Sequence, residues 1–408
     1  MEARTLYRAL ALSLLLVAPV LIYLAPGSAA WFFGGVFYLA PLWLPLLLFA
    51  IFAPLWLTYI RSQYVASIPY VVLELKPGEG TPKTARAMEM VFYSLYHRVS
   101  ISREKELLTG EIRMPWSFEI AASNGTVRFF IRVPKSQRQA VELRLRTEYR
   151  DIDIDEPRDY ARETGFDPIS MRLSVREYEL QKPDPYPLKT YETYEASPKT
   201  PSPFDRLTER LVEVGESEHL FISFMVRPHQ RARKKIWKQE QETLHESATE
   251  EIARIVGPSG DPRQLPKQTQ EVVKAIEDAL KKPSFECGIR AVYFASREAF
   301  SAVKANQLDE LFVAFGDPHL NGFVALNPRE RLTWPFSDIF SALPWISDSY
   351  FFHLFRRRAY FAPPYYGKSF VLNTAELATV FHLPYVSRSS ALSRSRGARL
   401  EPPDELPV

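Results

Sequence analysis

The residues that could do chemistry most directly are Gly367-Lys368-Ser369, which match the end of a phosphate-binding loop. Such a loop requires a glycine five residues before Gly367, because its backbone amides must wrap around a phosphate without obstruction by side chains. That position holds Ala362, and two prolines follow it. The sequence therefore predicts a surface turn here, without nucleotide binding or hydrolysis.

Three aspartates alternate along a short segment, at Asp151, Asp153 and Asp155. Alternate residues of a strand point to one face, so these carboxylates could hold a metal ion. Ile152 and Ile154 would point to the other face, which favours an edge strand with a charged outer side. The seven histidines show no metal-binding spacing with the single cysteine. We therefore predict no catalytic residue, no cofactor, no metal and no enzymatic activity.

Two clusters of basic side chains could contact the phosphates of nucleic acid or of lipid. They are Arg231, Arg233, Lys234 and Lys235 in the middle of the chain, and Arg356, Arg357 and Arg358 near its end. Glutamates soon follow the first cluster, and the formal net charge of the whole chain is only +3. A solvated helix start is the simpler explanation of the first cluster, and contact with nucleic acid is the alternative.

The elements that would position these residues begin with a membrane anchor. No Asp, Glu, Lys or Arg occurs from Ala9 to Ile60, although 24% of the chain is charged. A spanning helix needs about 20 apolar residues, so this segment predicts two spans separated by a turn at Pro26-Gly27. We place the spans at residues 6–24 and 35–59, and the whole transmembrane hairpin at residues 1–64.

Positive charge flanks this apolar segment on both sides. Arg4 and Arg8 precede it and Arg61 follows it, whereas the turn has no positive charge. The positive-inside rule then predicts a multi-pass protein of the inner membrane, with lipid as a partner and the soluble part in the cytoplasm. The alternative is a cleaved signal peptide, because Ser28-Ala29-Ala30 offers small residues after an apolar run. A single cysteine, Cys287, fits a reducing compartment.

After the anchor, the hydrophobic pattern predicts an α+β fold. The order strand, helix, strand, strand, helix, strand occurs twice, and it is typical of a ferredoxin-like (split βαβ) unit. The first unit is residues 65–160, with strands at 70–75, 116–121, 127–133 and 152–154 and helices at 84–97 and 136–150. The second is residues 161–335, with strands at 171–180, 220–227, 289–295 and 322–326, helices at 203–214 and 297–315, and a helical insertion at 229–282.

A segment rich in aromatic residues follows at 336–386, and residues 387–408 have the composition of a disordered tail. Exposed aromatic patches commonly mark protein contacts, so this segment is a candidate docking surface. The candidate docking residues are Phe351, Phe352, Phe355, Tyr360, Tyr365 and Tyr366. The alternative, that these rings complete the core of the second unit, stays open. A short helix at 372–381 should begin at Asn373 or Thr374, although Thr374 lies too close to Glu376 for a capping box.

Several strings of this sequence resemble a known family. They are VVLELKPGEGTPKTARAMEMVFYSLY (71–96), WSFEIAASNGTVRFFIRVPK (116–135), IDIDEPRDY (152–160), VLNTAELATVFHLP (371–384) and EPPDELP (401–407). They look like the N-terminal region of bacterial membrane-associated proteins related to the ATPases of type IV secretion and conjugation. The resemblance implies a membrane-docked, hexameric component of a DNA or protein translocation machine. The ATPase core that follows in that family is not matched here.

The leading hypothesis is therefore a non-catalytic, membrane-anchored scaffold that docks a separate secretion-type ATPase. A chain that carries the N-terminal module without the motor would need that subunit as a partner, and the resemblance adds a homo-oligomer. The alternative is a membrane-bound nucleic-acid-binding module, which the two basic clusters motivate.

Overall fold

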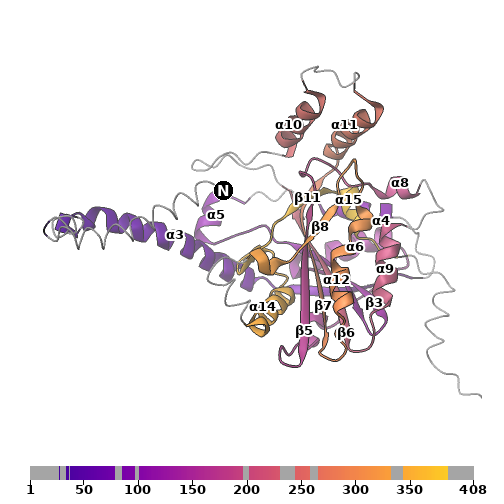
Figure 1. Cartoon of the computed structure of the whole chain (residues 1–408), viewed down its shortest axis with the longest axis horizontal. Helices are drawn as coiled ribbons and strands as arrows, with labels where there is room; N and C mark the ends of the chain where they lie inside the picture. The colour runs from indigo at the N-terminus through magenta and orange to yellow at the C-terminus, as the bar shows by residue number, and fades with distance from the viewer. Residues whose placement is uncertain are drawn as a thin grey trace, which may run out of the picture. The chain divides into compact units, whose positions relative to one another are not determined.

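The structure is a computed structural model (Figure 1), and it describes residues 27, 34–35, 37–78, 85–96, 101–195, 202–229, 244–257, 265–331 and 343–384. The chain divides into two compact units, Met1–Arg61 and Ser62–Val408. The second unit has a mixed α+β fold, which confirms the predicted fold class.

The described part of the N-terminal region is dominated by one helix, α3 (Ala40–Ser67). Among the described residues it is the one helix that is long and apolar enough to cross a membrane. It contains most of the second predicted span and continues beyond it to Ser67. The helix ends at Ser67 because Ile68 precedes Pro69, and a residue before a proline avoids the helical conformation. The first predicted span falls on residues outside the described ranges, so the hairpin stays a prediction.

The second unit is built on a large antiparallel sheet, which has nine strands in the described ranges. Its strands are β1 (Tyr70–Lys76), β2 (Trp116–Ser123), β3 (Thr126–Pro134), β4 (Asp153–Asp155), β5 (Met171–Leu180), β6 (Glu218–Pro228), β7 (Ser284–Ser296), β8 (Phe323–Leu326) and β11 (Phe370–Asn373). The order is β4-β1-β3-β2-β6-β7-β5-β8, and β11 pairs with one end of β7. The predicted strands at these positions are confirmed, apart from β11, which was not foreseen.

The strand order repeats about the centre of the sheet. Within each half, the fourth strand lies outermost and is followed by the first, third and second, so that β2 and β6 meet in the middle. They pair antiparallel from Trp116 opposite Val226 to Ser123 opposite His219. Both strands are buried along nearly their whole length on both faces. A strand of this kind requires a neighbour on each side, so the strands of the two predicted units form one continuous sheet.

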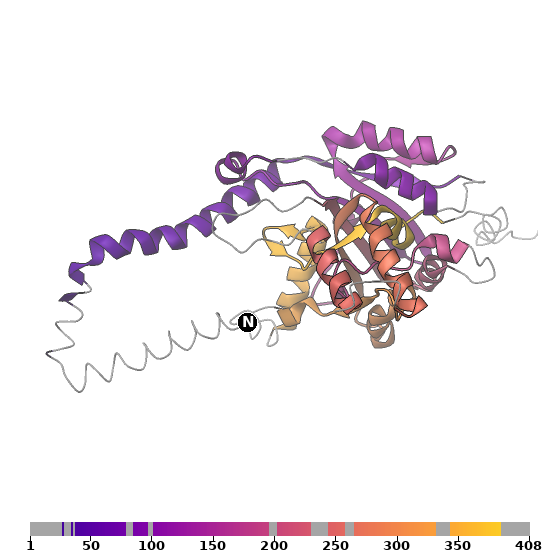
Figure 2. The ribbon, with the colours of Figure 1, turned by 90° about the horizontal axis from the view of Figure 1, so that it is seen from above.

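Helices cover both faces of the sheet (Figure 2). One face packs against α4 (Ala85–Leu95), α6 (Arg138–Glu148), α9 (Pro203–Val212), α12 (Ala302–Gln307) and α15 (Thr374–Val380). The other face packs against α7 (Tyr160–Glu163) and α14 (Pro344–Arg357). Two further helices, α10 (Leu244–Val256) and α11 (Lys267–Leu280), contact each other in the predicted helical insertion. Two short α-helices, α5 (Arg103–Leu108) and α8 (Tyr191–Glu195), also lie in the described ranges.

Local sequence explains several element boundaries. The turn between β2 and β3 has Asn124 and Gly125 at φ 51° and 68°, as the predicted hairpin requires. The predicted helix at 297–315 is shorter, because the Ser301 side chain caps α12 by accepting a bond from the Lys304 amide. For α15, Asn373 is the N-cap and forms a capping box with Glu376, three residues later. The sequence interpretation measured that spacing from Thr374 and so missed the box.

Candidate functional site

A row of polar side chains crosses the middle of the sheet between α14 and the strands. Glu119 on β2, Ser223 on β6, Arg290 on β7 and Glu177 on β5 are successive cross-strand neighbours. All four are buried in strands that are otherwise mainly apolar. A buried charge is tolerated only when it is paired and hydrogen-bonded, so Glu119, Arg290 and Glu177 each require a partner.

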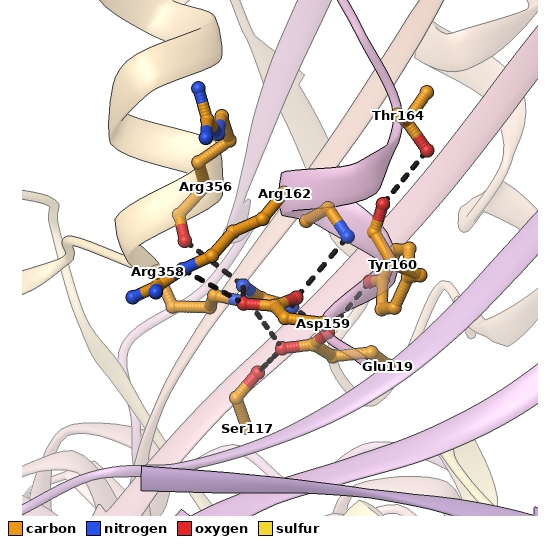
Figure 3. A network of polar contacts seen from close by, with 9 residues as sticks. Ser117, Glu119, Asp159, Tyr160, Arg162, Thr164, Arg356 and Arg358 are labelled. Atoms are coloured by element: carbon orange, nitrogen blue, oxygen red, sulfur yellow. Dashed lines mark hydrogen bonds and ion pairs between the residues drawn. The ribbon is translucent and has the colours of Figure 1, made fainter. Parts of the chain in front are cut away.

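The partner of Glu119 is Arg358, which follows the last residue of α14 (Figure 3). The Arg358 guanidinium donates from Nε and Nη2 to the two carboxylate oxygens of Glu119, at 2.9 Å each. It also donates to both oxygens of Asp159, at 2.8 Å each. Arg358 has a left-handed backbone conformation with φ 50°, which is unfavourable for a residue with a Cβ. The two bidentate ion pairs offset that cost.

Further hydroxyl groups complete this cluster. Glu119, whose side chain is 0% exposed, also accepts bonds from the Tyr160 hydroxyl at 2.6 Å and from the Ser117 hydroxyl. The Tyr160 ring stacks on Phe130 with the ring centres 4.5 Å apart. Asp159 in turn is the N-cap of α7. The cluster thus connects β2, α7 and the end of α14 through groups whose hydrogen-bonding capacity is largely used.

The electrostatics of this cluster favour permanent charge. Burial alone would lower the pKa of Arg358, but the Glu119 carboxylate raises that pKa well above its usual value. Burial would raise the pKa of Asp159, whereas its bonds to Arg358 bring that pKa below the usual value. Burial and the Glu119 charge raise the pKa of Tyr160 far above 10. None of these three groups exchanges a proton near neutral pH, so the cluster suits a structural clamp.

A second ion pair lies in the other half of the sheet. Arg290 donates from Nε and Nη2 to one carboxylate oxygen of Glu177, at 3.0 and 2.6 Å. The Tyr365 hydroxyl donates to the other oxygen at 2.8 Å. The rings of Tyr360 and Tyr365 lie 5.6 and 5.2 Å from the guanidinium carbon of Arg290. A cation beside two aromatic rings gains further stabilisation.

One stretch of chain supplies the partners for both halves. We call residues 343–368 the cover segment; it contains α14, β9 (Phe361–Ala362) and β10 (Tyr365–Tyr366). Through Arg358 it binds Glu119 in the first half of the sheet, and through Tyr365 it binds Glu177 in the second. The cover segment therefore holds the two halves from one face.

The Gly367-Lys368-Ser369 string lies at the end of this cover. The Gly367 amide donates to the Tyr360 carbonyl at 2.7 Å, and the Tyr360 hydroxyl donates to the Lys368 carbonyl at 2.8 Å. A Cβ at Gly367 would overlap the Tyr360 ring, so this glycine makes room for an aromatic side chain. Lys368 forms an ion pair with Glu179. These residues therefore pack against Tyr360 and pair with Glu179, which the sequence motif alone did not indicate.

The candidate docking residues are mostly inside the protein. Phe351, Phe352, Phe355, Tyr360 and Tyr365 are buried, and only Tyr366 of this set is exposed, at 57%. The first three pack against the sheet in the core under α14. The helix at 344–357 turns these three rings toward the sheet. The spacing of the aromatic residues in the sequence could not show whether they face the sheet or the solvent. The alternative that the rings complete the chain's own core therefore describes five of the six.

The candidate phosphate contacts separate into different groups. Arg356 and Arg357 are exposed, whereas Arg358 is buried in the cluster with Glu119. Arg231, Arg233, Lys234 and Lys235 lie outside the described residues. Sequence reasoning missed Glu119 and Glu177, although each carries a signal: an acidic residue inside an apolar strand, where an unpaired charge would be costly.

The fold and the cluster together define a class: an α+β protein with a large antiparallel sheet, clamped on one face by buried ion pairs. Residues 81–390, most of the chain, match the family described as Domain of unknown function (DUF8128). The chain belongs to this family. No curated protein matches the sequence.

Proposed function

We propose that this protein is a membrane-anchored, non-catalytic scaffold. The observation that carries the proposal is the short connection between the apolar helix and the sheet. Helix α3 ends at Ser67 and β1 begins at Tyr70, so only Ile68 and Pro69 lie between them. The three Cα–Cα steps from Ser67 to Tyr70 span about 11 Å at most, so β1 begins close to the end of α3 and the proposed anchor keeps the folded unit near the membrane.

The clamp supports the second part of the proposal, a rigid platform. An ion pair from Arg358 to Glu119 and a hydrogen bond from the Tyr365 hydroxyl to Glu177 connect the cover segment to both halves of the sheet. Breaking the Arg358–Glu119 pair would leave a buried charge without its ionic partner, which is strongly unfavourable. The halves therefore act as one body, which suits a scaffold that must present a fixed surface.

Finer features belong to the same proposal. The order fourth, first, third, second within each half is what a ferredoxin-like unit would have, and we assign one such unit to each half. The charge pattern around the apolar segment supports a hairpin in the inner membrane, with both ends in the cytoplasm. The resemblance to type IV secretion and conjugation proteins supports a secretion-type ATPase as the partner and a homo-oligomer as the assembly.

The test uses the full chain with an affinity tag in native membranes. We expect the protein to stay in the membrane pellet after extraction with alkaline carbonate. After chemical cross-linking and affinity purification, we expect to recover a nucleoside-triphosphatase of the secretion class. We also expect cross-linked species with masses that are multiples of the mass of the chain. A matched tagged membrane protein with an unrelated soluble domain serves as the control. Complete release by carbonate would contradict the anchor, and recovery of the uncross-linked monomer alone would contradict the scaffold.

A further inference from the structure

We propose that the outer face of α14 lies against the headgroups of an anionic membrane. This inference rests on the membrane anchor of the proposed function and adds a second contact with lipid. It concerns the side of the helix that turns away from the sheet.

The outer face of α14 combines an aromatic side chain with basic ones. Trp345, Ser349, His353, Arg356 and Arg357 follow one another at intervals of four, four, three and one, which places them on one side of a helix. Trp345 is 52% exposed, and His353, Arg356 and Arg357 are exposed as well. Tryptophan favours the depth of the headgroups, and arginine binds their phosphates bidentately.

The charge of this face is positive. The single acidic residue of α14, Asp348, is buried and pairs with Arg329 at 2.5 Å. Figure 3 shows the Arg356 side chain pointing away from the Glu119 cluster, into which Arg358 points. On α7, which contacts α14, the exposed Arg162 and Glu163 offset each other's charge. Anionic lipid complements such a surface.

The positive charges of Arg356 and Arg357 act on the nearby side chain of His353. Partial burial lowers the pKa of His353, and the charges of Arg357 and Arg356 lower it further. This mutual repulsion is relieved when phosphate groups neutralise the arginines. Lipid is favoured over nucleic acid as the occupant, because the two-residue connection from α3 keeps this unit beside the bilayer.

The experiment reports how deep the α14 face lies in reconstituted vesicles of the full chain. Ser349→Cys carries an environment-sensitive fluorophore, and the natural Cys287 is buried and can stay in place. Vesicles are made of phosphatidylcholine, either alone or with about one third phosphatidylglycerol. We expect a blue shift, and quenching by headgroup spin-labelled lipid, in the anionic vesicles only. Replacing Arg356 and Arg357 by Gln should lower the ratio of membrane-apposed to free conformations by about thirty-fold.

Two controls are matched to this design. Leu143→Cys places the same fluorophore on α6, which packs on the opposite face of the sheet, at a position 65% exposed. That label should not respond to the lipid. Arg144→Gln with Arg150→Gln removes the same charge from exposed positions near that face and should leave the Ser349→Cys signal unchanged.

Three outcomes would overturn the inference. If the label at residue 349 responds to neither lipid while the protein resists carbonate extraction, the anchor stands and the α14 contact is refuted. If added DNA shifts the label and anionic lipid does not, the face binds nucleic acid instead. If carbonate releases the protein, the proposed anchor fails, and this inference fails with it.

Discussion

At the scale of single residues, three consecutive arginines have different roles. Arg356 and Arg357 end α14 and are exposed, whereas Arg358 takes the left-handed cap position and is buried. Each step along a helix turns the side chain by about 100°, so neighbours in sequence face different surroundings. A cluster of like residues in a sequence can thus contain both a surface group and a core group.

Replacing Arg358 should be strongly destabilising. Arg358→Met leaves Glu119 buried without its partner, and the free energy of unfolding should fall by about 3–5 kcal/mol. Arg356→Met, on the exposed face, should change it by about 0.5 kcal/mol or less. Denaturant unfolding of the full chain in detergent measures both. Adding Glu119→Gln to Arg358→Met should restore part of the loss, and a purely additive double variant would contradict the ion-pair explanation.

Glu376 should make stability depend on pH in an unusual direction. Burial raises the pKa of this carboxyl from 4.5 to about 7 in the folded protein. Between these pH values the folded state binds more protons than the unfolded state, so this group lowers stability as pH rises through the window. The full effect is about 3 kcal/mol. Glu376→Gln removes it, so the stability of the variant relative to wild type should increase between pH 4.5 and pH 8, as denaturant titrations would show.

His382, just after α15, makes the free energy of unfolding depend on pH in the opposite direction. Burial lowers the pKa of His382 from 6.5 to about 4, so its contribution to stability is present above pH 6.5 and is lost as pH falls towards 4. Between pH 4.5 and pH 6.5 the contribution of His382 opposes that of Glu376. Glu376→Gln should expose the histidine slope, with stability falling from pH 6.5 to pH 4. A variant with the same pH dependence as wild type over this range would refute this assignment.

At the scale of elements, the hairpin formed by β9 and β10 depends on two glycines. The Tyr360 ring before this hairpin lies against Gly288 on β7 and against Gly367, where a Cβ at either position would overlap it. The sequence drew attention to Gly367 as part of a nucleotide motif, but it offered no sign that Gly288 is its counterpart. Such a pairing depends on contacts between residues far apart in the chain.

Gly288→Ala should therefore lift Tyr360 from the sheet. The overpacked ring should cost about 3 kcal/mol in the free energy of unfolding and should loosen the hairpin that follows it. Limited proteolysis of the full chain should show faster cleavage between residues 359 and 368. Gly165→Ala is the control, because a Cβ there has no neighbour within 4 Å in the described structure. Equal proteolysis of the two variants would contradict this role for Gly288.

Most strands could be located from sequence because their patterns are local. Residues 70–75 are apolar apart from Glu74 and include two β-branched valines, and Asn124-Gly125 specifies a turn, so β1, β2 and β3 followed directly. The neighbour of β2 could not be found in this way. Pairing with β6 is a contact about a hundred residues along the chain, and either strand alone shows only that it is apolar on both faces. The four residues of β11 are too few to show periodicity.

At the scale of the whole molecule, the C-terminal elements are part of the core. Every residue of α15 is buried, and β11 pairs with β7. Deleting residues 343–408 would remove both elements together with Arg358 and Tyr365. The prediction of a separable docking segment could not anticipate this, because the same aromatic residues suit an interface and a core equally well.

We accordingly expect this deletion to prevent folding of the second unit. Membranes that contain the shortened chain should show complete protease digestion beyond α3 at protease levels that leave wild type intact. Deleting residues 385–408 removes no described contact and serves as the comparison. A melting transition unchanged by the longer deletion would show that the cover segment is dispensable and would restore the docking interpretation.

The central pairing of β2 with β6 also determines how the sheet responds to dilution. These strands occupy corresponding places in the two halves and run antiparallel, which is how two copies of one half would meet about a two-fold axis. Separate copies would come apart as their concentration fell. Here the peptide between Asp155 and Met171 tethers the halves, and a short tether imposes an effective concentration on the order of millimolar. The sheet consequently stays whole at any expression level, even when a single molecule is present.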